Sequence, residues 1–429
     1  MLNRNSHHSK VWLLFFFIFC VASNILLNAQ EKKDTLSLNL PQAEKLFIDS
    51  NFILLAQHYN VDAQKALVEQ AKVWQNPTLN TDIGIAANGK FVNYRKNADG
   101  TFNGQYYIQI QQLILTAKKR GKLIDLSNTN TKLSELQLQD VLRNLRYQLR
   151  QDYYAIQQQL ALVALYNDQA FQLDKLLKGM KAQLEAGNIA QKDYVRIQAL
   201  VISLQQDRTE LYKSLADNES ELKTLLQIRN TNVFIKPLDV LKAEVPMPDN
   251  LENLINTALR NNPNYLLQQS QTVYQQQTLS YQKALQTPDI TLGPNFDRNS
   301  NFAPNYVGLG VSVPLPIFNK NKGNIKSVEA NIKQQKALTQ NAETELRNNV
   351  SNAYQKLLLS LELNNKTQRD FYSSYTTIYH NMLDSYKQRQ INLLEFLDFY
   401  NDYTESQKKL LDQQLNLQLA AAELQYYTQ

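Results

Sequence analysis

An internal duplication is the feature of this sequence that most restricts its fold. The helical segment that stops at Asn76-Pro77 matches the one that stops at Thr287-Pro288, and Gly187 matches Arg389, at nearly one offset. A unit of about 200 residues is therefore repeated, and such repeats determine the architecture. Each half is expected to run helix, strand, strand, very long helix, turn and long helix. We predict one body of two intertwined halves, although 429 residues would otherwise suggest about two or three domains.

The sequence predicts four parts. Residues 1–29 form a signal peptide and residues 30–230 the first repeat. Residues 231–249 form an extended equatorial linker that contains three prolines, and residues 250–429 form the second repeat. The predicted fold class is mainly α with a transmembrane β part, in which long helical hairpins turn near residues 187 and 389.

The N-terminus has the pattern of a secretory signal. Arg4 and Lys10 precede an apolar run that is too short to span a bilayer, and Ala29-Gln30 is a suitable cleavage point. The only cysteine, Cys20, follows Phe19 rather than the small residue of a lipoprotein site. We therefore expect secretion without lipidation.

Four segments alternate apolar and polar residues with a period of two. They lie at about residues 78–88, 104–115, 289–297 and 305–317. An apolar face toward lipid and a polar face toward a lumen are typical of membrane barrels. Four strands cannot close a barrel, and open sheet edges are not tolerated in lipid, so a membrane location would require oligomerisation. The alternative is a soluble sheet buried on one face.

The remaining segments are expected to be helical and rich in Gln and Asn. The run over 118–186 contains no proline and corresponds to roughly 100 Å of helix. Apolar residues recur along it at helical spacing, which also fits a plain soluble coiled coil. The predicted helices cover 41–75, 118–186, 190–228, 250–286, 326–388 and 391–427.

Several kinds of function are excluded by motif and charge. No phosphate-binding loop, dinucleotide fingerprint, zinc helix or nucleophile elbow is present, so we expect neither an enzyme nor a cofactor. The net charge of +6, of which the leader supplies two, is too small to indicate nucleic acid. After cleavage only His58 and His380 remain as soft ligands, without ligand spacing, so a metal cargo would pass through rather than be held.

Five stretches of the sequence carry a resemblance to a known family: Asn76-Pro77, Thr287-Pro288, 117–121, 313–325 and 185–194. Through them the chain resembles the TolC-like outer-membrane factors, and the resemblance covers nearly all of the mature chain. Residues 41–47 and 104–112 are in addition similar to the cobalt–zinc–cadmium and copper/silver (CzcC/CusC-like) efflux branch.

The resemblance implies a homotrimer. Three chains would form a 12-stranded barrel in the outer membrane of a Gram-negative cell and a helical tunnel through the periplasm. The tunnel would dock with a periplasmic adaptor (a membrane fusion protein) and an RND-type inner-membrane pump, and would pass substrate outward without chemistry. Heavy-metal efflux fits the subfamily. Efflux of drugs or other organic compounds and type I protein secretion stay open, as does a periplasmic coiled-coil adaptor or structural protein.

The resemblance also implies docking at the hairpin tips. In the family the first turn meets the adaptor, which points to Gly187, Asn188 and Ile189, and by repetition to Arg389 and Gln390. A plain connecting turn is the alternative. Because a non-glycine residue is strained in a left-handed turn, we expect the second tip to be shaped differently.

Glu395 and Asp398 match the acidic positions that the family has near its periplasmic mouth. They are three residues apart and share one helix face. A trimer would carry six carboxylates around a narrow opening, and such acidic rings concentrate cations. The first-half equivalents, Asp193 and Arg196, can pair with each other. Ile391 stands where relatives have a basic tethering residue, and two solvated carboxylates are the alternative interpretation.

Overall fold

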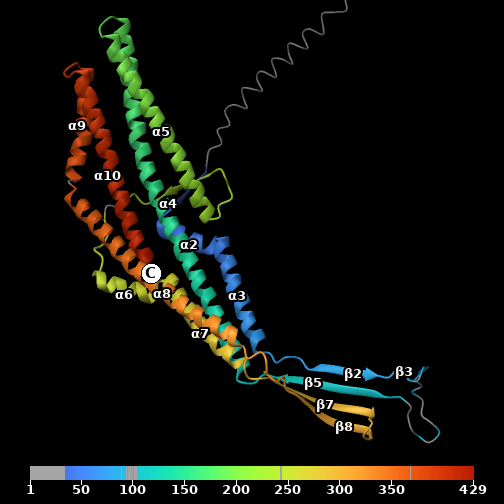
Figure 1. Cartoon of the computed structure of the whole chain (residues 1–429). Helices are drawn as coiled ribbons and strands as arrows, with labels where there is room; N and C mark the ends of the chain where they lie inside the picture. Colours follow the sequence, from blue (N-terminus) through green and yellow to red (C-terminus); the bar gives the residue numbers. More distant parts are fainter. Residues whose placement is uncertain are drawn as a thin grey trace, which may run out of the picture. The chain divides into compact units, whose positions relative to one another are not determined.

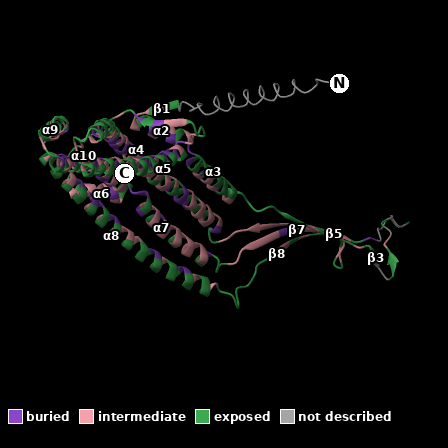
Figure 2. Cartoon of the chain, turned by 90° about the horizontal axis from the view of Figure 1, so that it is seen from above, coloured by how far each residue is buried: buried purple, intermediate pink, exposed green. Residues whose placement is uncertain are grey.

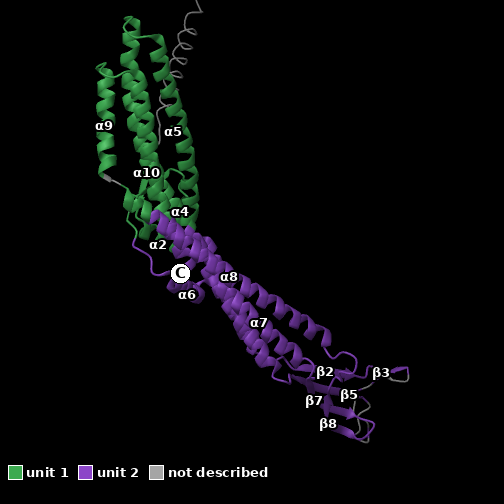
Figure 3. Ribbon diagram, turned by 60° about the vertical axis from the view of Figure 1, so that its left-hand side comes forward, with its two compact units in different colours: residues 1–51, 148–245, 362–419 green, residues 52–147, 246–361, 420–429 purple. Residues whose placement is uncertain are grey.

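The chain forms two compact units, each built from both halves of the sequence (Figure 3). The computed structural model describes residues 34–429 except 88, 93, 95–97, 99, 101–103, 242, 243 and 368, so the expected signal peptide lies outside the described residues. Unit 1 contains residues up to 51, 148–245 and 362–419. Unit 2 contains residues 52–147, 246–361 and 420–429. Within the described ranges, no helix combines the length and the apolar character needed to cross a membrane.

Unit 2 contains a four-stranded antiparallel sheet (Figure 1). Its order is β2-β5-β7-β8, so each half of the sequence contributes one hairpin and β5 pairs with β7 between them. The strands are β2 (Thr78–Ile83), β5 (Tyr106–Ile114), β7 (Ile290–Asn299) and β8 (Pro304–Ser312). β3 (Ala86–Ala87) and β4 (Lys90–Phe91) form a separate short hairpin.

The register places the alternating apolar residues on one face, as predicted. Leu79 lies opposite Ile110, Ile108 opposite Phe296, and Leu292 opposite Val311. These positions share one face because neighbouring residues of a strand point to opposite sides. The apolar side chains are open to the surroundings: 74% of Val307 and 66% of Leu309 is exposed. The other face carries amides and glycines, including the pairs Asn80–Gln109 and Gly293–Gly310.

Three strands are shorter than the predicted intervals, most clearly β2 and β8. β8 ends at Ser312 instead of continuing to 317, because Pro314 and Pro316 have no N–H group for a ladder. β2 ends at Ile83, and the chain beyond it turns into the small β3–β4 hairpin.

Four helical segments extend from this sheet in unit 2. α3 (Phe52–Lys72) and α7 (Pro263–Ala284) lead into β2 and β7, whereas α4 (Lys119–Glu185) and α8 (Lys322–Lys366) leave β5 and β8. Figure 2 shows that α8 is largely exposed, with buried residues at intervals along it. Those buried residues include Val350 and Leu357, which follow helical spacing.

The two helices predicted at 41–75 and 250–286 are each broken, which corrects the prediction. The first is α2 (Leu40–Ser50) and α3, separated at Asn51; the second is α6 (Leu251–Asn261) and α7, separated at Asn262. Both asparagines are extended, with ψ of 118° and 115°. Asn262 caps α7 by accepting the Tyr265 N–H at 3.2 Å, and Pro263 suits the opening position. The breaks occupy matched positions of the duplication.

Unit 1 contains the remainder of α4 with α5 (Gln191–Leu225), α9 (Arg369–Lys387) and α10 (Leu393–Thr428). It also contains a feature that we did not predict, a parallel pair of strands β1 (Asp34–Leu38) and β6 (Val233–Pro237). β6 lies in the predicted linker. The pair is tied to α4, because the Tyr153 hydroxyl donates to the Leu38 carbonyl at 3.0 Å.

The helix predicted over 326–388 is also interrupted. α8 ends at Lys366 and α9 begins at Arg369, and residue 368 lies outside the described residues. At this end the Thr367 N–H bonds to the Asn364 carbonyl at 3.2 Å, a tighter closure than the α-helical bond. The Thr367 hydroxyl accepts a bond from Gln413 at 2.6 Å, which ties the break to α10.

Asp152 is a buried carboxyl group on α4. Only 6% of it is exposed, and its Oδ2 atom has no hydrogen-bond partner among the residues that the structure describes. Burial, with a smaller contribution from the charge of Glu221, raises its pKa from 3.8 to about 7. Between pH 4 and 7 the carboxyl group is therefore mostly protonated in the folded state, whereas it is ionised in the unfolded chain.

We predict that Asp152 makes stability depend on pH. Its folded-state pKa lies above the unfolded value, so its stabilisation is complete below pH 4 and is lost as the pH rises through 7. Asp152→Asn should match the wild type near pH 4 and exceed it by up to about 4 kcal/mol at pH 8. The test is the free energy of unfolding by denaturant, measured at several pH values. Asp168→Asn, at an exposed position of α4, is the control. If the free energies of wild type and Asp152→Asn change with pH in parallel, the prediction is contradicted.

Lys119 and Asp289 join the two hairpins where the sheet meets the helices. The Lys119 ammonium lies 2.7 Å from Asp289 Oδ1 and 2.6 Å from the Thr287 carbonyl oxygen. The same carboxylate accepts the Thr116 N–H at 2.8 Å. The Lys119 side chain is 4% exposed and the Asp289 side chain 22%, so the ammonium group of this ion pair is buried and the carboxylate is partly open to solvent.

Asp289→Asn should lower the free energy of unfolding by about 3 kcal/mol, because it leaves a buried ammonium without its counter-charge. The measurement is denaturant unfolding of the detergent-solubilised protein. Asp125→Asn, the same change at an exposed position of α4, serves as the control. Equal, small effects of the two substitutions would show that the pair contributes little.

Candidate functional site

The two hairpin tips have the same backbone. In the first, Gly187 has φ of 73° and donates to the Leu184 carbonyl at 2.9 Å, while the Asn188 N–H reaches the Gln183 carbonyl at 2.8 Å. In the second, the bonds Arg389–Tyr386 and Gln390–Ser385, both 2.9 Å, repeat this pattern. Both turns are left-handed helix caps that satisfy the last carbonyl groups of their helices.

The expectation that Arg389 reshapes the second tip is therefore wrong. Arg389 adopts φ of 61°, in the region that glycine favours. The conformation costs a residue with a Cβ atom about 1–2 kcal/mol. A side-chain bond accompanies it: the Arg389 guanidinium donates to Gln183 Oε1 at 2.8 Å.

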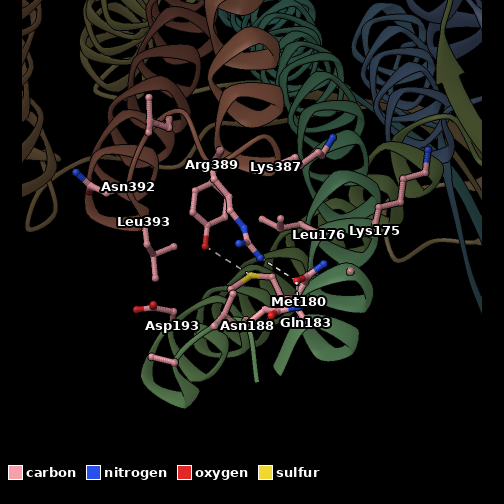
Figure 4. Close-up of a pocket in the computed structure, with 15 residues that line it drawn as sticks. Lys175, Leu176, Met180, Gln183, Asn188, Asp193, Lys387, Arg389, Asn392 and Leu393 are labelled. Atoms are coloured by element: carbon pink, nitrogen blue, oxygen red, sulfur yellow. Dashed lines mark hydrogen bonds between the residues drawn. The ribbon is translucent and has the colours of Figure 1, made fainter. Parts of the chain in front are cut away.

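Gln183 links the two tips. Its Oε1 atom accepts hydrogen bonds both from Arg389 and, at 3.0 Å, from Asn188 Nδ2 (Figure 4). The tips enclose a cavity of about 600 Å³. Its wall combines Met180 and Tyr386 with the ends of Lys175 and Lys387 and with further residues of both turns.

An aromatic core lies behind the tips, between α4, α5, α9 and α10. Tyr379 stacks on Tyr403 with ring centroids 4.4 Å apart, and Tyr386 stacks on Phe396 at 5.1 Å. Tyr379 and Phe396 are 1% exposed. The two hairpins therefore share a single core near their ends, which fixes one tip against the other.

Glu395 and Asp398 lie in the first two turns of α10. Both are exposed, while Phe396 and Tyr400 of the same helix are buried. Asn392 Oδ1 accepts the Glu395 N–H at 2.9 Å and so caps the helix. A carboxylate in the first turn is stabilised by the helix dipole. The arrangement leaves two negative charges on an open helix face next to a tip.

The first-half equivalents differ from this arrangement. Asp193 lines the tip cavity, and Arg196 lies on the exposed side of α5. In the described part of the chain, no ion pair joins them, so the expected pairing is not formed. Ile391 also lines the cavity. α5 begins after Ala190 without a side-chain cap, whereas Asn392 caps the start of α10. The helix that leaves the second tip is therefore the better capped of the two.

Two contributors to the tip, Gln183 and Asn392, were not predicted. Asn392 had a signal, since Asn-Leu-Leu-Glu matches the pattern of a helix cap followed three residues later by Glu. Gln183 had none, because it is one glutamine in a Gln-rich helix and its role depends on a partner 206 residues away.

Metal ligation has no site within the described residues, where no group of three or more His, Cys, Asp or Glu side chains could hold an ion. His58 is exposed on α3, and His380 lies against the Tyr379 ring at 5.2 Å.

Comparisons with known proteins agree with this architecture. The chain is 24% identical over 293 residues to the cobalt-zinc-cadmium resistance protein CzcC of Cupriavidus metallidurans, covering 68% of this chain and 66% of that protein, just under two thirds of its length. A membrane protein from Pseudomonas aeruginosa has the same fold, with a TM-score of 0.74, 15% identity and coverage of 93% and 94%. The solved structure of CusC superposes with a TM-score of 0.71 and 16% identity, and the match covers 94% of each chain.

The family assignment comes from a match to the whole repeated body. The model of the outer membrane efflux proteins matches residues 45–226 and 254–428, which together include both tips, all four strands of the large sheet and the long helices. The chain therefore belongs to the outer membrane efflux protein family.

Proposed function

We propose that this protein is the trimeric outer-membrane exit duct of an efflux system. One observation carries the proposal: a four-stranded sheet with one largely apolar face is joined at one end to helices that are far longer than a globular core requires. An exposed apolar sheet face is costly in water and suited to lipid. The helices, whose surfaces are rich in amides, would extend into the periplasm after secretion through the N-terminal leader.

Closure of the sheet supports the trimer. β2 and β8 are the two edges of the sheet, and their outer backbone groups cannot remain unpaired in lipid. Pairing β8 of one copy with β2 of the next would close the ring. Three copies would give the 12 strands that the resemblance implies, and the exposed apolar residues of α3 and α8, such as Leu67 and Leu359, would then meet a neighbour.

Transport through such a duct involves no bond making, and the energy would come from an inner-membrane pump of the RND type. Heavy-metal cations are the proposed cargo. CzcC is named for cobalt, zinc and cadmium resistance, and the Glu395–Asp398 pair places carboxylates on an open face beside a tip. Ducts for drugs, other organic compounds or polypeptides share this fold, so the exported compound is the variable to test.

A first test is channel conductance in planar bilayers. Glu395→Ala/Asp398→Ala should lower cation selectivity about twofold or more, since removing six carboxylates from a trimer weakens the field that concentrates cations at the mouth. Asp62→Ala/Glu69→Ala removes equal charge from the exposed side of α3 and is the matched control. A pore with unchanged selectivity would discard the gate and keep the channel, and a folded trimer without a pore would reject both.

The tips are the proposed docking surface for a periplasmic adaptor. Gly187, Asn188 and Ile189 form the first turn, and Arg389 and Gln390 the second. Both turns present the same left-handed backbone, so an adaptor that recognises one by shape can recognise the other. Binding would thus depend on the turn conformation at residue 389 and not on its charge.

Two substitutions at Arg389 separate conformation from charge. Both remove the bond to Gln183, but glycine accepts the left-handed conformation whereas a β-branched residue does not. Arg389→Gly should bind the cognate adaptor within about twofold of wild type, and Arg389→Val should bind about tenfold more weakly. Surface plasmon resonance with purified adaptor measures both, with Arg196→Val as the control. Equal binding by the glycine and valine variants would contradict docking through this turn.

A further inference from the structure

The most strongly charged part of the described chain is not at the tips but where the strands meet the helices. We call the segments 70–77, 115–124, 281–289 and 313–326 the junction belt. The belt contains nine basic residues and a single acidic one, Asp289, so its net charge exceeds the +6 of the entire chain. The basic residues are Lys72, Lys118, Lys119, Arg120, Lys122, Lys283, Lys320, Lys322 and Lys326.

Hydrogen bonds show that the four segments lie at one level. Gln112 next to the belt donates to the Gln75 carbonyl at 3.0 Å, and the Arg120 guanidinium donates to the Lys72 carbonyl. The Lys119–Asp289 pair joins the second segment to the third. Gln286 Nε2 donates to the Lys320 carbonyl at 3.0 Å and joins the third to the fourth. The belt is therefore a continuous band at one end of the sheet (Figure 1).

Most of the charge in this band is exposed and uncompensated. Only Lys119 is buried in an ion pair, and Lys122 bonds to the Ser280 hydroxyl. The other six ammonium groups are exposed, and none of them lies in an ion pair with another described residue: Lys72, Lys118, Lys283, Lys320, Lys322 and Lys326. An exposed cluster of one sign repels itself and attracts anionic surfaces.

Local helix energetics do not account for these positions. α4 and α8 begin with basic residues, and neither has an acidic residue in its first turn. A helix N-terminus carries partial positive charge, so these lysines oppose the dipole instead of complementing it. An anion outside the chain would relieve both repulsions at once.

Large apolar side chains stand between the exposed lysines. Phe318 is 99% exposed, Leu315 73%, Ile317 64% and Trp74 58%. Arg120 stacks over the Trp74 ring at 4.6 Å. Aromatic and aliphatic residues that alternate with snorkelling basic side chains are typical of a membrane–water interface. A soluble polyanion would account for the lysines but not for these apolar side chains.

We infer that the junction belt binds the headgroups of anionic phospholipids in the periplasmic leaflet of the outer membrane. The inference rests on the proposed function, which places the sheet in that membrane and the helices in the periplasm. The phosphates would meet the six exposed ammonium groups, and Phe318 and Trp74 would lie at the boundary of the acyl chains. This contact would set the depth at which the sheet is inserted.

Lipid retention measured by native mass spectrometry tests the inference. The detergent-solubilised full-length protein is titrated with phosphatidylglycerol or with phosphatidylcholine. Wild type should retain phosphatidylglycerol preferentially. Lys320→Gln/Lys322→Gln/Lys326→Gln should lower that preference about tenfold, because each basic residue near an anionic surface contributes to binding.

The control is Lys178→Gln/Lys213→Gln/Lys366→Gln, which removes the same charge from exposed positions elsewhere on the helices. The control should retain phosphatidylglycerol as the wild type does. Equal loss in both triple variants, or no preference in the wild type, overturns the inference. Trimer mass and bilayer conductance, recorded on the same preparations, test the proposed function separately. If the triple variant does not assemble, Lys320→Gln/Lys322→Gln replaces it, with a proportionally smaller expected loss.

Discussion

Unpaired backbone at the two edges of the large sheet is the constraint on which the rest of this structure depends. A sheet of order β2-β5-β7-β8 buries neither edge, and its apolar face is exposed along β2, β8 and the middle of β5 and half-buried along β7. In water such a sheet would aggregate, and in lipid its edges would cost several kcal/mol for each unsatisfied group. Joining copies edge to edge, as proposed above, would solve both problems. The long helices would then form a wall that continues from the ring of strands.

The duplication is expressed differently in the two units. At the sheet, each half supplies one hairpin, and the Lys119–Asp289 pair joins the halves across β5 and β7. At the tips, the halves supply the same turn, although one has glycine and the other arginine at the left-handed position. At the tips, backbone geometry is therefore more alike between the halves than the side chains are, and the exposed acidic pair lies in the second half.

Much of this fold was predictable because the spacing of apolar residues and the positions of proline and glycine are local properties of the sequence. Alternation along β8 and the proline-free length of α4 each identify an element without knowledge of its partner. The missed helix breaks and the missed strand depended on partners. Asn51 and Asn262 break their helices through caps and bonds to distant carbonyl groups, and β6 is a strand only because β1 lies beside it. Glu395 and Asp398 were chosen through the resemblance to the family, whereas Gln183 required the folded pair of tips.

The two hydrogen bonds that Gln183 Oε1 accepts have a mechanical consequence. One amide oxygen holds both Asn188 and Arg389, and a shared aromatic core lies behind it. A force applied to either turn is therefore transmitted to the other, and the two hairpins move together until that oxygen loses one of its two hydrogen bonds. The contact that breaks first is this neutral acceptor, because it lies at the surface, where water can replace it.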